Sequence, residues 1–483
     1  MTQALAAVRL RSLRMPTASS LAVAALLLVL PLLLGDAVQD PNRIRFAVAV
    51  AALVTLLGVA TSSPSGSMLA LVVWLVALGM SRRLVSELAP ITRTDPLLLV
   101  SPVVLGLLAA AAIRRGALRN RTPLTNAVLA LSLLTLLGAV NPLQGSLVGG
   151  ISGLLFVFVP VLAFWIGRAY CDDRMLRRLL ALVAGLGIGA AVYGLVQVSS
   201  GFPAWDRQWI DDVSSSYAAL NVNGVIRPFA SFSSSAEYGM FLGLAIVVWL
   251  AMGRRLFVLP LTVGALAVLG PALVLESARG VVIALVATIG LLVGAQRRFP
   301  IVLSAGVGVI LLVALVFGLR NYGPSTYGTG TGAALLSHQV QGLADPLNPQ
   351  TSTAGEHLTL ITNGLRQAFS QPLGQGIGVV TIAGSKFGGL ANGTEADPSN
   401  VAVALGLPGL LAYLVILAVG MTRVYGIASR RHDGLALAAL GVVTLTVLQW
   451  LNGGQYAVVV LPWLVLGWAD RPDAAPSTVG AGR

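Results

Sequence analysis

Long apolar runs separated by short polar segments recur along the whole chain. Their cores lie near residues 21–35, 46–60, 68–80, 97–113, 125–140, 147–166, 179–198, 238–252, 256–275, 280–294, 299–319, 401–421, 435–451 and 456–468. A helix of about 20 apolar residues is long enough to cross the hydrocarbon layer of a bilayer. The pattern therefore predicts an all-α polytopic membrane protein with about 12 to 14 transmembrane helices.

The composition agrees with this class. Hydrophobic residues make up 56% of the 483 residues and charged residues only 10%, whereas about 25% of the residues of a soluble domain are charged. A membrane β-barrel would instead show short segments of alternating hydrophobicity, and the sequence has no such segments.

Arginine clusters between the apolar runs predict how the chain crosses the membrane, because loops rich in positive charge stay in the cytoplasm. One set of clusters falls on a single side of the membrane: Arg9, Arg11 and Arg14; Arg114, Arg115, Arg119 and Arg121; Arg174, Arg177 and Arg178; Arg254 and Arg255; Arg297 and Arg298; Arg423, Arg430 and Arg431. We expect this side to be the cytoplasm, with both termini there and the polar stretch 320–400 outside a bacterial cytoplasmic membrane.

Three arginines oppose this assignment. Arg82, Arg83 and Arg93 fall on the external side when the runs are counted. The neighbouring runs 46–60 and 68–80 are also short, so a broken or partly re-entrant pair is an alternative to two spanning helices. The predicted helix count therefore stays a range.

The net charge of +13 could indicate a protein that binds nucleic acid. The arginines lie in short clusters between apolar runs rather than on one basic face, so we exclude nucleic acid as a partner and expect membrane lipids instead. Cys171 is the only cysteine, which excludes an intrachain disulfide.

The longest stretch without a membrane-type apolar run lies between residues 320 and 400. Hydrocarbon cannot hold so many polar groups without internal partners, so we expect an external loop that carries short helices. His357, Glu395 and Asp397 are the candidate catalytic proton acceptors in this loop. Each of them can equally be a solvated loop side chain.

A glycine-rich run, Gly374 to Gly378, follows Pro372 in the same loop. The run does not match a Walker loop or a dinucleotide fingerprint, because both need a strand before the glycines and a helix after them. We expect a short helix from Leu365 that is ended by the proline and by a flexible glycine turn.

A second polar segment, residues 199–236, combines aromatic residues with carboxylates and amides. Trp205 and Trp209, together with Tyr238 just beyond the segment, are candidate sugar-binding residues, because aromatic rings stack on the apolar faces of pyranoses. An interfacial aromatic belt is an equally good interpretation of the two tryptophans.

Three arginines in separate external segments are candidate ligands of a pyrophosphate: Arg227, Arg279 and Arg366. Arg227 precedes a serine-rich helix start, a setting that suits a phosphate, although it could also anchor to lipid headgroups. Arg279 lies three residues after Glu276 at a membrane boundary, where charges are costly and usually functional. The alternative is a local ion pair between these two residues.

No set of histidines, cysteines and carboxylates has the spacing of zinc ligands. We therefore expect neither a metal nor a cofactor, and we expect arginines to carry the charge of the phosphates.

Four segments together resemble the O-antigen ligase and polymerase family of bacterial membrane glycosyltransferases. They are Arg-Pro-Phe-Ala-Ser-Phe at 227–232, Glu-Ser-Ala-Arg-Gly at 276–280, the stretch 363–378 that ends in Pro-Leu-Gly-Gln-Gly-Ile-Gly, and Gly-Leu-Pro-Gly at 406–409. The family's ligases carry a histidine eleven residues before the first glycine of the last segment. Here that position is Glu395, and this departure favours a polymerase over a ligase.

The resemblance implies a metal-independent glycosyltransferase that polymerises or ligates oligosaccharides linked to polyprenyl pyrophosphate, in the synthesis of cell-surface polysaccharide. The arginines would bind the pyrophosphate of the donor, and a carboxylate or histidine would deprotonate a hydroxyl of a glycan or lipid acceptor. The implied organisation is transmembrane helices in 1–222, a catalytic core in 223–421 that includes the external loop, further transmembrane helices in 422–468, and a disordered cytoplasmic tail in 469–483.

A polysaccharide or lipid transporter (a flippase) is the main alternative, and a non-catalytic assembly partner is the third. A transporter is expected to carry charges in the middle of helices and broken helices in matching halves. Here the charges cluster at predicted helix ends and in loops, which favours an enzyme at the external face.

Overall fold

The computed structural model describes residues 41–90, 95–213, 220–222, 224–256, 259–323, 327–350 and 352–471. The apolar run 21–35, the N-terminal arginines, Arg93 and the polar tail from residue 472 onward lie outside the described residues.

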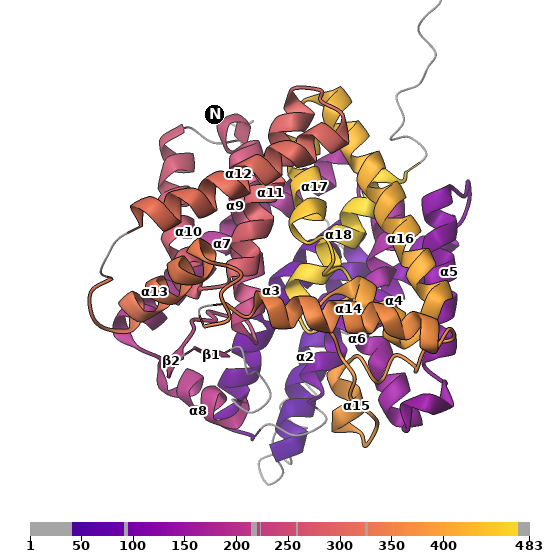
Figure 1. The fold of residues 1–483 in the computed structure, drawn as a ribbon. Helices are drawn as coiled ribbons and strands as arrows, with labels where there is room; N and C mark the ends of the chain where they lie inside the picture. The colour runs from indigo at the N-terminus through magenta and orange to yellow at the C-terminus, as the bar shows by residue number, and fades with distance from the viewer. Residues whose placement is uncertain are drawn as a thin grey trace, which may run out of the picture.

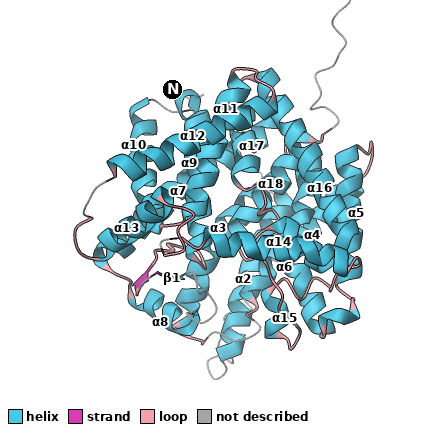
Figure 2. Ribbon diagram, in the orientation of Figure 1, coloured by secondary structure: helices cyan, strands magenta, loops and turns pink. Residues whose placement is uncertain are grey.

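The described chain is almost entirely helical (Figure 1), with β structure only in one small hairpin (Figure 2). The helices are α2 (Pro41–Ser62), α3 (Pro64–Ser86), α4 (Leu97–Arg114), α5 (Pro123–Gly138), the 3-10 turn η1 (Pro142–Gln144), α6 (Leu147–Tyr170), α7 (Asp173–Ser200), α8 (Ala204–Val213), α9 (Ser235–Leu256), α10 (Leu259–Glu276), α11 (Arg279–Gln296), α12 (Ile301–Tyr322), α13 (Thr331–Ala344), α14 (Ala354–Ser370), α15 (Ile382–Lys386), α16 (Asp397–Arg431), α17 (Gly434–Leu445) and α18 (Tyr456–Ala469). The hairpin pairs β1 (Asn221–Val222) antiparallel with β2 (Val225–Ile226).

Ten of the described helices are long and apolar enough to cross a membrane, and α5, α17 and α18 are shorter apolar helices. Each apolar run predicted between residues 46 and 468 therefore corresponds to a helix. A helix satisfies its backbone N–H and C=O groups internally, which a chain in hydrocarbon requires. The structure confirms the prediction of an all-α polytopic membrane protein.

The two short runs form full-length helices, α2 and α3, and both are candidate spans. Only Ser63 separates them, and its side-chain oxygen accepts a hydrogen bond from the backbone N–H of Gly66 and so caps α3. The runs looked short because Arg45 lies inside α2, and Arg82 and Arg83 lie inside α3. Both helices are therefore long and apolar enough to cross a membrane.

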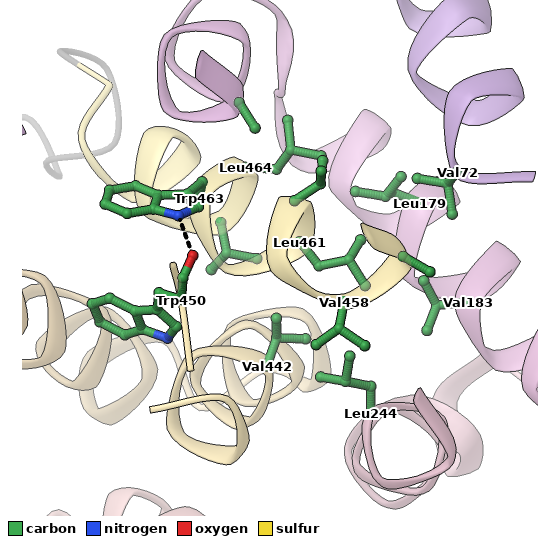
Figure 3. Close-up of a cluster of buried hydrophobic side chains, with 14 of the residues drawn as sticks. Val72, Leu179, Val183, Leu244, Val442, Trp450, Val458, Leu461, Trp463 and Leu464 are labelled. Atoms are coloured by element: carbon green, nitrogen blue, oxygen red, sulfur yellow. Dashed lines mark hydrogen bonds between the residues drawn. The ribbon is translucent and has the colours of Figure 1, made fainter. Parts of the chain in front are cut away.

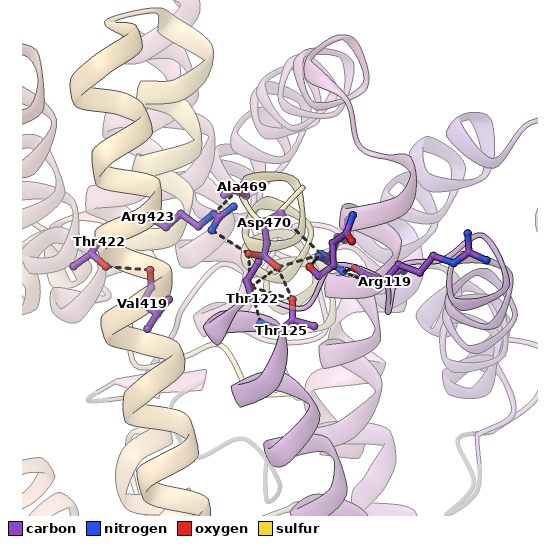
Figure 4. Close-up of polar contacts among 11 residues, drawn as sticks. Arg119, Thr122, Thr125, Val419, Thr422, Arg423, Ala469 and Asp470 are labelled. Carbon is purple, nitrogen blue, oxygen red and sulfur yellow. Dashed lines mark hydrogen bonds and ion pairs between the residues drawn. The ribbon is translucent and has the colours of Figure 1, made fainter. Parts of the chain in front are cut away.

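Most of the arginine clusters that the sequence places on one side gather at one end of the bundle, the arginine-rich end. Asp470, just after α18, forms ion pairs with Arg168 at 3.1 Å and with Arg423 at 3.4 Å. Thr122, which caps α5, and Thr125 within α5 also donate hydrogen bonds to its carboxylate (Figure 4). One carboxylate thus joins α5, α6, α16 and α18.

A second set of contacts extends the arginine-rich end. Arg431 at the end of α16 pairs with Asp173 at 2.6 Å, and Arg298 after α11 contacts His432. Trp468 donates a hydrogen bond from Nε1 to Asp173, which joins this group to the neighbourhood of Asp470.

Arg82 and Arg83 lie away from these clusters and in the interior of the protein. Arg82 pairs with Asp95 at 2.7 Å, and Arg45 pairs with the same carboxylate at 3.1 Å. Arg83 lies 2.8 Å from Asp206 of α8, with both side chains fully buried. Buried, neutralised arginines are not solvated loop charges, which explains why these two residues do not follow the positive-inside pattern.

The core contains two short helices, α17 and α18, in which every residue except Tyr456 is buried. At a rise of 1.5 Å per residue they are about 18 and 21 Å long, less than the roughly 30 Å of hydrocarbon in a bilayer. The segment 446–455 that joins them therefore turns inside the bundle. Trp463 of α18 donates a hydrogen bond from Nε1 to the carbonyl of Trp450 in this segment at 2.8 Å (Figure 3).

The opposite end of the bundle, the loop end, carries α8 and the helices α13, α14 and α15. The loop expected over 320–400 is shorter at both ends, because α12 continues to Tyr322 and α16 begins at Asp397. The helix expected around Leu365 is α14, and it ends just before Pro372. In Figure 1, α14 runs across the bundle rather than along it. The backbone of α16 is interrupted at Gly406 (φ 63°), so a short first segment, 397–405, precedes the long one.

Candidate functional site

A cavity of about 780 Å³ lies among α2, α3, α4, α6 and α8, the segment around α15, the start of α16, and the segment 449–456. Phe46, Leu99 and Ile382 line this cavity and are also exposed on the surface of the bundle. The cavity therefore reaches the exposed surface of the protein beside α2 and α4.

The lining of the cavity has two chemically different parts. The apolar part comes from α4, α6 and the segment before α15: Leu98, Leu155, Phe156, Val157 and Val380. The polar part comes mainly from α3, the segment 381–400 and the segment 449–452: Arg82, Asp95, Thr381, Lys386, Thr394, Glu395, Asp397, Asn400, Gln449 and Asn452. Such a cavity can hold a molecule that is apolar at one end and rich in polar groups at the other.

Asp397, the first residue of α16, lies on the polar side of the cavity and is buried. Its Oδ2 atom accepts hydrogen bonds from the hydroxyl of Tyr413 at 2.7 Å and from the backbone N–H of Leu451 at 2.8 Å. The backbone N–H of Asp397 in turn donates to the carbonyl of Leu448. These bonds fix the segment 446–455 to the start of α16, so Asp397 acts as a structural clamp of the cavity wall.

Glu237 of α9 makes a similar bond at the other end of the same segment. Its buried carboxylate accepts a hydrogen bond from the backbone N–H of Ala457, in the first turn of α18, at 2.8 Å. A carboxylate at this position satisfies a backbone donor that a helix start leaves unpaired. The sequence analysis missed Glu237, because its partner lies 220 residues away in the chain.

Glu395 also lines the cavity, and it is about 40% exposed. His357 of α14 lies beside it, with Nδ1 3.2 Å from Glu395 Oε1. The other ring nitrogen of His357 is 3.1 Å from the hydroxyl of Thr353. The structure thus brings together two of the three predicted proton acceptors, although nearly forty residues separate them in the chain. Unlike Asp397, Glu395 is open to a ligand.

The cations that line this cavity are Arg82 and Lys386. Arg82 is held by Asp95 and lies over the ring of Trp209, with its guanidinium carbon 4.8 Å from the ring centre. Lys386 is the last residue of α15, on the polar side of the cavity. The sequence analysis predicted neither residue as a ligand of a phosphate. Lys386 could have been singled out because it is the only lysine in the sequence.

Arg227 and Arg279 meet at a second site, near the junction of α10 and α11. Arg227 is buried and forms an ion pair with Glu276, and its Nε donates to the carbonyl of the same residue at 2.8 Å. The alternative of a local pair between Glu276 and Arg279 is therefore not realised, because Glu276 pairs with Arg227 instead. The guanidinium of Arg279 packs on Gly342 of α13.

His338 of α13 belongs to this second site. Its Nδ1 lies 2.8 Å from the hydroxyl of Ser277, a residue with a left-handed backbone (φ 68°). Burial, followed by the positive charges of Arg279 and Arg227, lowers the pKa of His338 to about 4. His338 is therefore neutral at physiological pH. The buried Nε atom of Arg279 has no hydrogen-bond partner within the described part of the chain.

Arg366 does not join the other two arginines. It is exposed on α14, whereas Gly364 and Ala368 of the same helix are buried. Gly364 packs against Ser399 of α16, so the face of α14 that contacts the bundle is not the face that carries Arg366. Figure 1 shows α13 and α14 well separated at the loop end. The structure therefore does not assemble the three-arginine site that the sequence predicted.

The three predicted sugar-binding residues have different surroundings. Trp209 is buried but borders the cavity beneath Arg82. Trp205 is half-buried and donates a hydrogen bond from Nε1 to the hydroxyl of Tyr193 at 3.0 Å. Tyr238 is fully buried, so it cannot stack on a sugar. Its hydroxyl packs so closely on Gly194 of α7 that a Cβ atom there would lie only 2.0 Å from it. Only Trp209 lies where a ligand in the cavity could reach its edge.

The glycine-rich run has a packing role. Gly374 (φ 75°) and Gly376 (φ 101°) have left-handed backbones, which favour glycine. A Cβ atom at Gly374 would lie 2.4 Å from the carbonyl oxygen of Ala404. The backbone N–H of Gly378 donates to Oε1 of Gln144, next to α5. The run therefore closes the loop onto α16 and η1 rather than forming a phosphate cradle.

Within the described ranges, no group of three or more histidine, cysteine, aspartate or glutamate residues is arranged to hold a metal ion. No protein-family model and no curated protein matches this chain.

Proposed function

We propose that this protein is a glycosyltransferase of the bacterial cytoplasmic membrane that polymerises or ligates oligosaccharides linked to polyprenyl pyrophosphate. The observation that carries the proposal is the cavity of about 780 Å³, which has an apolar part that reaches the exposed surface beside α2 and α4 and a polar part that contains Glu395. A lipid-linked glycan has the same two parts in one molecule. The resemblance of four segments to the O-antigen ligase and polymerase family supports the same substrate class.

In this proposal the loop end faces outside the cell. The arginine-rich end then lies in the cytoplasm, as the positive-inside rule requires. When the apolar runs are counted, Arg82 and Arg83 oppose this orientation, but both are buried in ion pairs. They therefore do not count as charges of an external loop.

The proposed reaction is a displacement at the anomeric carbon of the donor sugar. An acceptor hydroxyl forms the new bond to this carbon, the bond from the carbon to the phosphate oxygen breaks, and polyprenyl pyrophosphate leaves. Glu395 takes the proton of the acceptor hydroxyl, and His357 holds the carboxylate in position. Lys386 and Arg82, which line the cavity, stabilise the charge that develops on the pyrophosphate.

The test is turnover by the purified protein in nanodiscs, with a polyprenyl-pyrophosphate-linked oligosaccharide as the substrate. Glu395→Gln should lower the rate by about 10²–10⁴-fold, the usual contribution of a general base. Glu356→Gln is the matched control, because Glu356 is exposed on α14 next to His357 and does not line the cavity. Wild-type activity in the Glu395 variant would refute this assignment of the base.

A transporter of the same lipid-linked glycan is the second candidate. The short helices α17 and α18 and the interrupted backbone of α16 at Gly406 favour it, because broken helices near a cavity are typical of transporters. Liposomes that contain the protein and a fluorescent lipid-linked oligosaccharide separate the two functions. Movement of the lipid to the other leaflet without formation of a glycosidic bond would support the transporter.

A further inference from the structure

Helix α14 has an apolar flank that the described part of the protein covers only in part. Leu358, Ile361, Leu365 and Phe369 recur along it at spacings of three or four residues, which places them on one side of the helix. Phe369 is 74% exposed, and Leu373, which follows the helix, is 80% exposed. Large apolar side chains rarely remain exposed in a contiguous patch without a partner or a membrane.

The other two sides of α14 have different environments. One side packs on the bundle, where Ala368 contacts the cluster formed with Ala402 and Leu410 of α16. The remaining side carries Asn363 and Arg366, both exposed. The helix therefore has a protein-facing side, a polar side and an apolar flank on which Leu358 and Phe369 are exposed.

Two hydrogen bonds fix Leu373 between α16 and the end of α5. The backbone N–H of Leu407, in α16, donates to the carbonyl of Pro372 at 3.0 Å. The side-chain amide of Asn141, just after α5, donates to the carbonyl of Gly374 at 3.0 Å. Leu373 lies between these two attachment points. The adjacent surfaces are apolar and exposed as well, at Val140 beside α5 and Leu411 on α16.

The height of these attachment points in the bundle can be obtained from helix geometry. Leu407 lies 16 residues before Arg423 of the arginine-rich end, which corresponds to about 24 Å at 1.5 Å per residue. Val140 lies 18 residues after Thr122 at the same end, which corresponds to about 27 Å. With a hydrocarbon layer of roughly 30 Å, both positions fall near its outer boundary.

We propose that the flank formed by Leu358, Phe369 and Leu373 inserts into the outer boundary of the bilayer, so that α14 lies along the membrane surface. The occupant of the apolar flank is lipid, because the flank continues the exposed apolar surface of α5 and α16. Arg366 borders the flank and carries a charge that suits headgroup phosphates. This contact fixes the orientation of α14 and thereby the position of His357 beside the cavity. The inference depends on the membrane fold and not on the proposed activity.

The test uses single-cysteine variants with an environment-sensitive fluorophore in nanodiscs. Cys171 is buried, and burial raises the pKa of its thiol to about 12, so this cysteine reacts poorly with labelling reagents. All variants also carry Cys171→Ala, so that only the introduced cysteine can be labelled. Labels go on Phe369→Cys and Leu373→Cys. Asn363→Cys serves as the control for the polar side, and Leu411→Cys serves as the control for lipid contact.

We expect labels at 369 and 373 to be quenched several-fold more by spin-labelled lipid than by aqueous iodide, as at 411. The label at 363 should show the opposite preference. Efficient iodide quenching at 369 and 373 would refute the proposal, because these side chains would then be in water. Protection from both quenchers would also refute it, because protein would then cover the flank. Thermal unfolding of each labelled variant verifies that it is folded.

Discussion

The carboxylate of Asp397 accepts a hydrogen bond from the backbone N–H of Leu451 at 2.8 Å. This bond connects the first turn of α16 to the segment that turns between α17 and α18 inside the bundle. The same carboxylate oxygen accepts the hydroxyl of Tyr413. Asp397 therefore lies in the wall of the cavity with its Oδ2 atom already bound to two buried donors.

We predict that Asp397→Ala destabilises the protein, because it leaves two buried donors without a partner, at a cost of about 1–3 kcal/mol for each group. Asp397→Asn keeps an oxygen acceptor and should be affected less. Thermal unfolding in detergent, followed by tryptophan fluorescence, measures both. An Asp397→Asn variant with unchanged thermal stability and no transferase activity would instead identify Asp397 as the catalytic base.

Arg83 and Asp206 form a buried ion pair between α3 and α8. Removing one partner of such a pair costs about 3–5 kcal/mol, because the other charge stays buried without compensation. We expect Arg83→Met and Asp206→Asn each to lower the thermal stability. The double variant should lose less than the sum of the two single losses, as a double-mutant cycle would show.

The same variants test the topology. If Arg83 is a structural charge and not a topological signal, Arg83→Met leaves the orientation of reporter fusions after α3 unchanged. Additive losses in the cycle, or an inverted reporter, would contradict this interpretation.

Gly374 and Gly388 have the same backbone φ of 75° but different surroundings. A Cβ atom at Gly374 would clash with the carbonyl of Ala404, whereas at Gly388 it would meet open space. Both alanine variants carry the cost of a left-handed backbone, about 1–2 kcal/mol. We predict that Gly374→Ala is clearly less stable than Gly388→Ala in chemical or thermal unfolding. Equal losses would mean that packing of the glycine run on α16 is unimportant.

His338 predicts a pH dependence of stability. Burial and the charges of Arg279 and Arg227 lower its pKa in the folded protein to about 4, below the roughly 6.5 of an unfolded chain. Between these values the unfolded state binds more protons than the folded state, so stability rises with pH in this window. The contribution is complete above about pH 6.5 and is lost as the pH falls towards 4.

We therefore expect the melting temperature of the wild type to fall between pH 7 and pH 4.5 more than that of His338→Gln, which cannot gain a proton at this position. Glutamine retains a group that can bond the hydroxyl of Ser277. His357→Gln is the control, because His357 is half-exposed at the cavity rim. Parallel curves for wild type and His338→Gln would contradict the prediction.

The helices, and the gathering of arginine clusters at one end of the bundle, followed from the sequence alone. Apolar runs of sufficient length form helices because each backbone group finds its partner four residues away, which is a local property. Arg423, which belongs to one of the predicted arginine clusters, lies at the arginine-rich end and pairs there with Asp470. Glu395 was also reached from the sequence, through its position in a polar loop and its distance from Gly406.

The tertiary structure decided which of these side chains meet, because their partners are remote in the chain. Arg83 pairs with Asp206, more than one hundred residues away, and Glu276 pairs with Arg227 rather than with Arg279, the partner in the local-pair alternative. Arg366 remains exposed, because the face of α14 that carries Gly364 and Ala368 packs against α16. Such pairings depend on how whole helices pack against one another, and a periodic pattern of apolar residues specifies the packing face but not the neighbour.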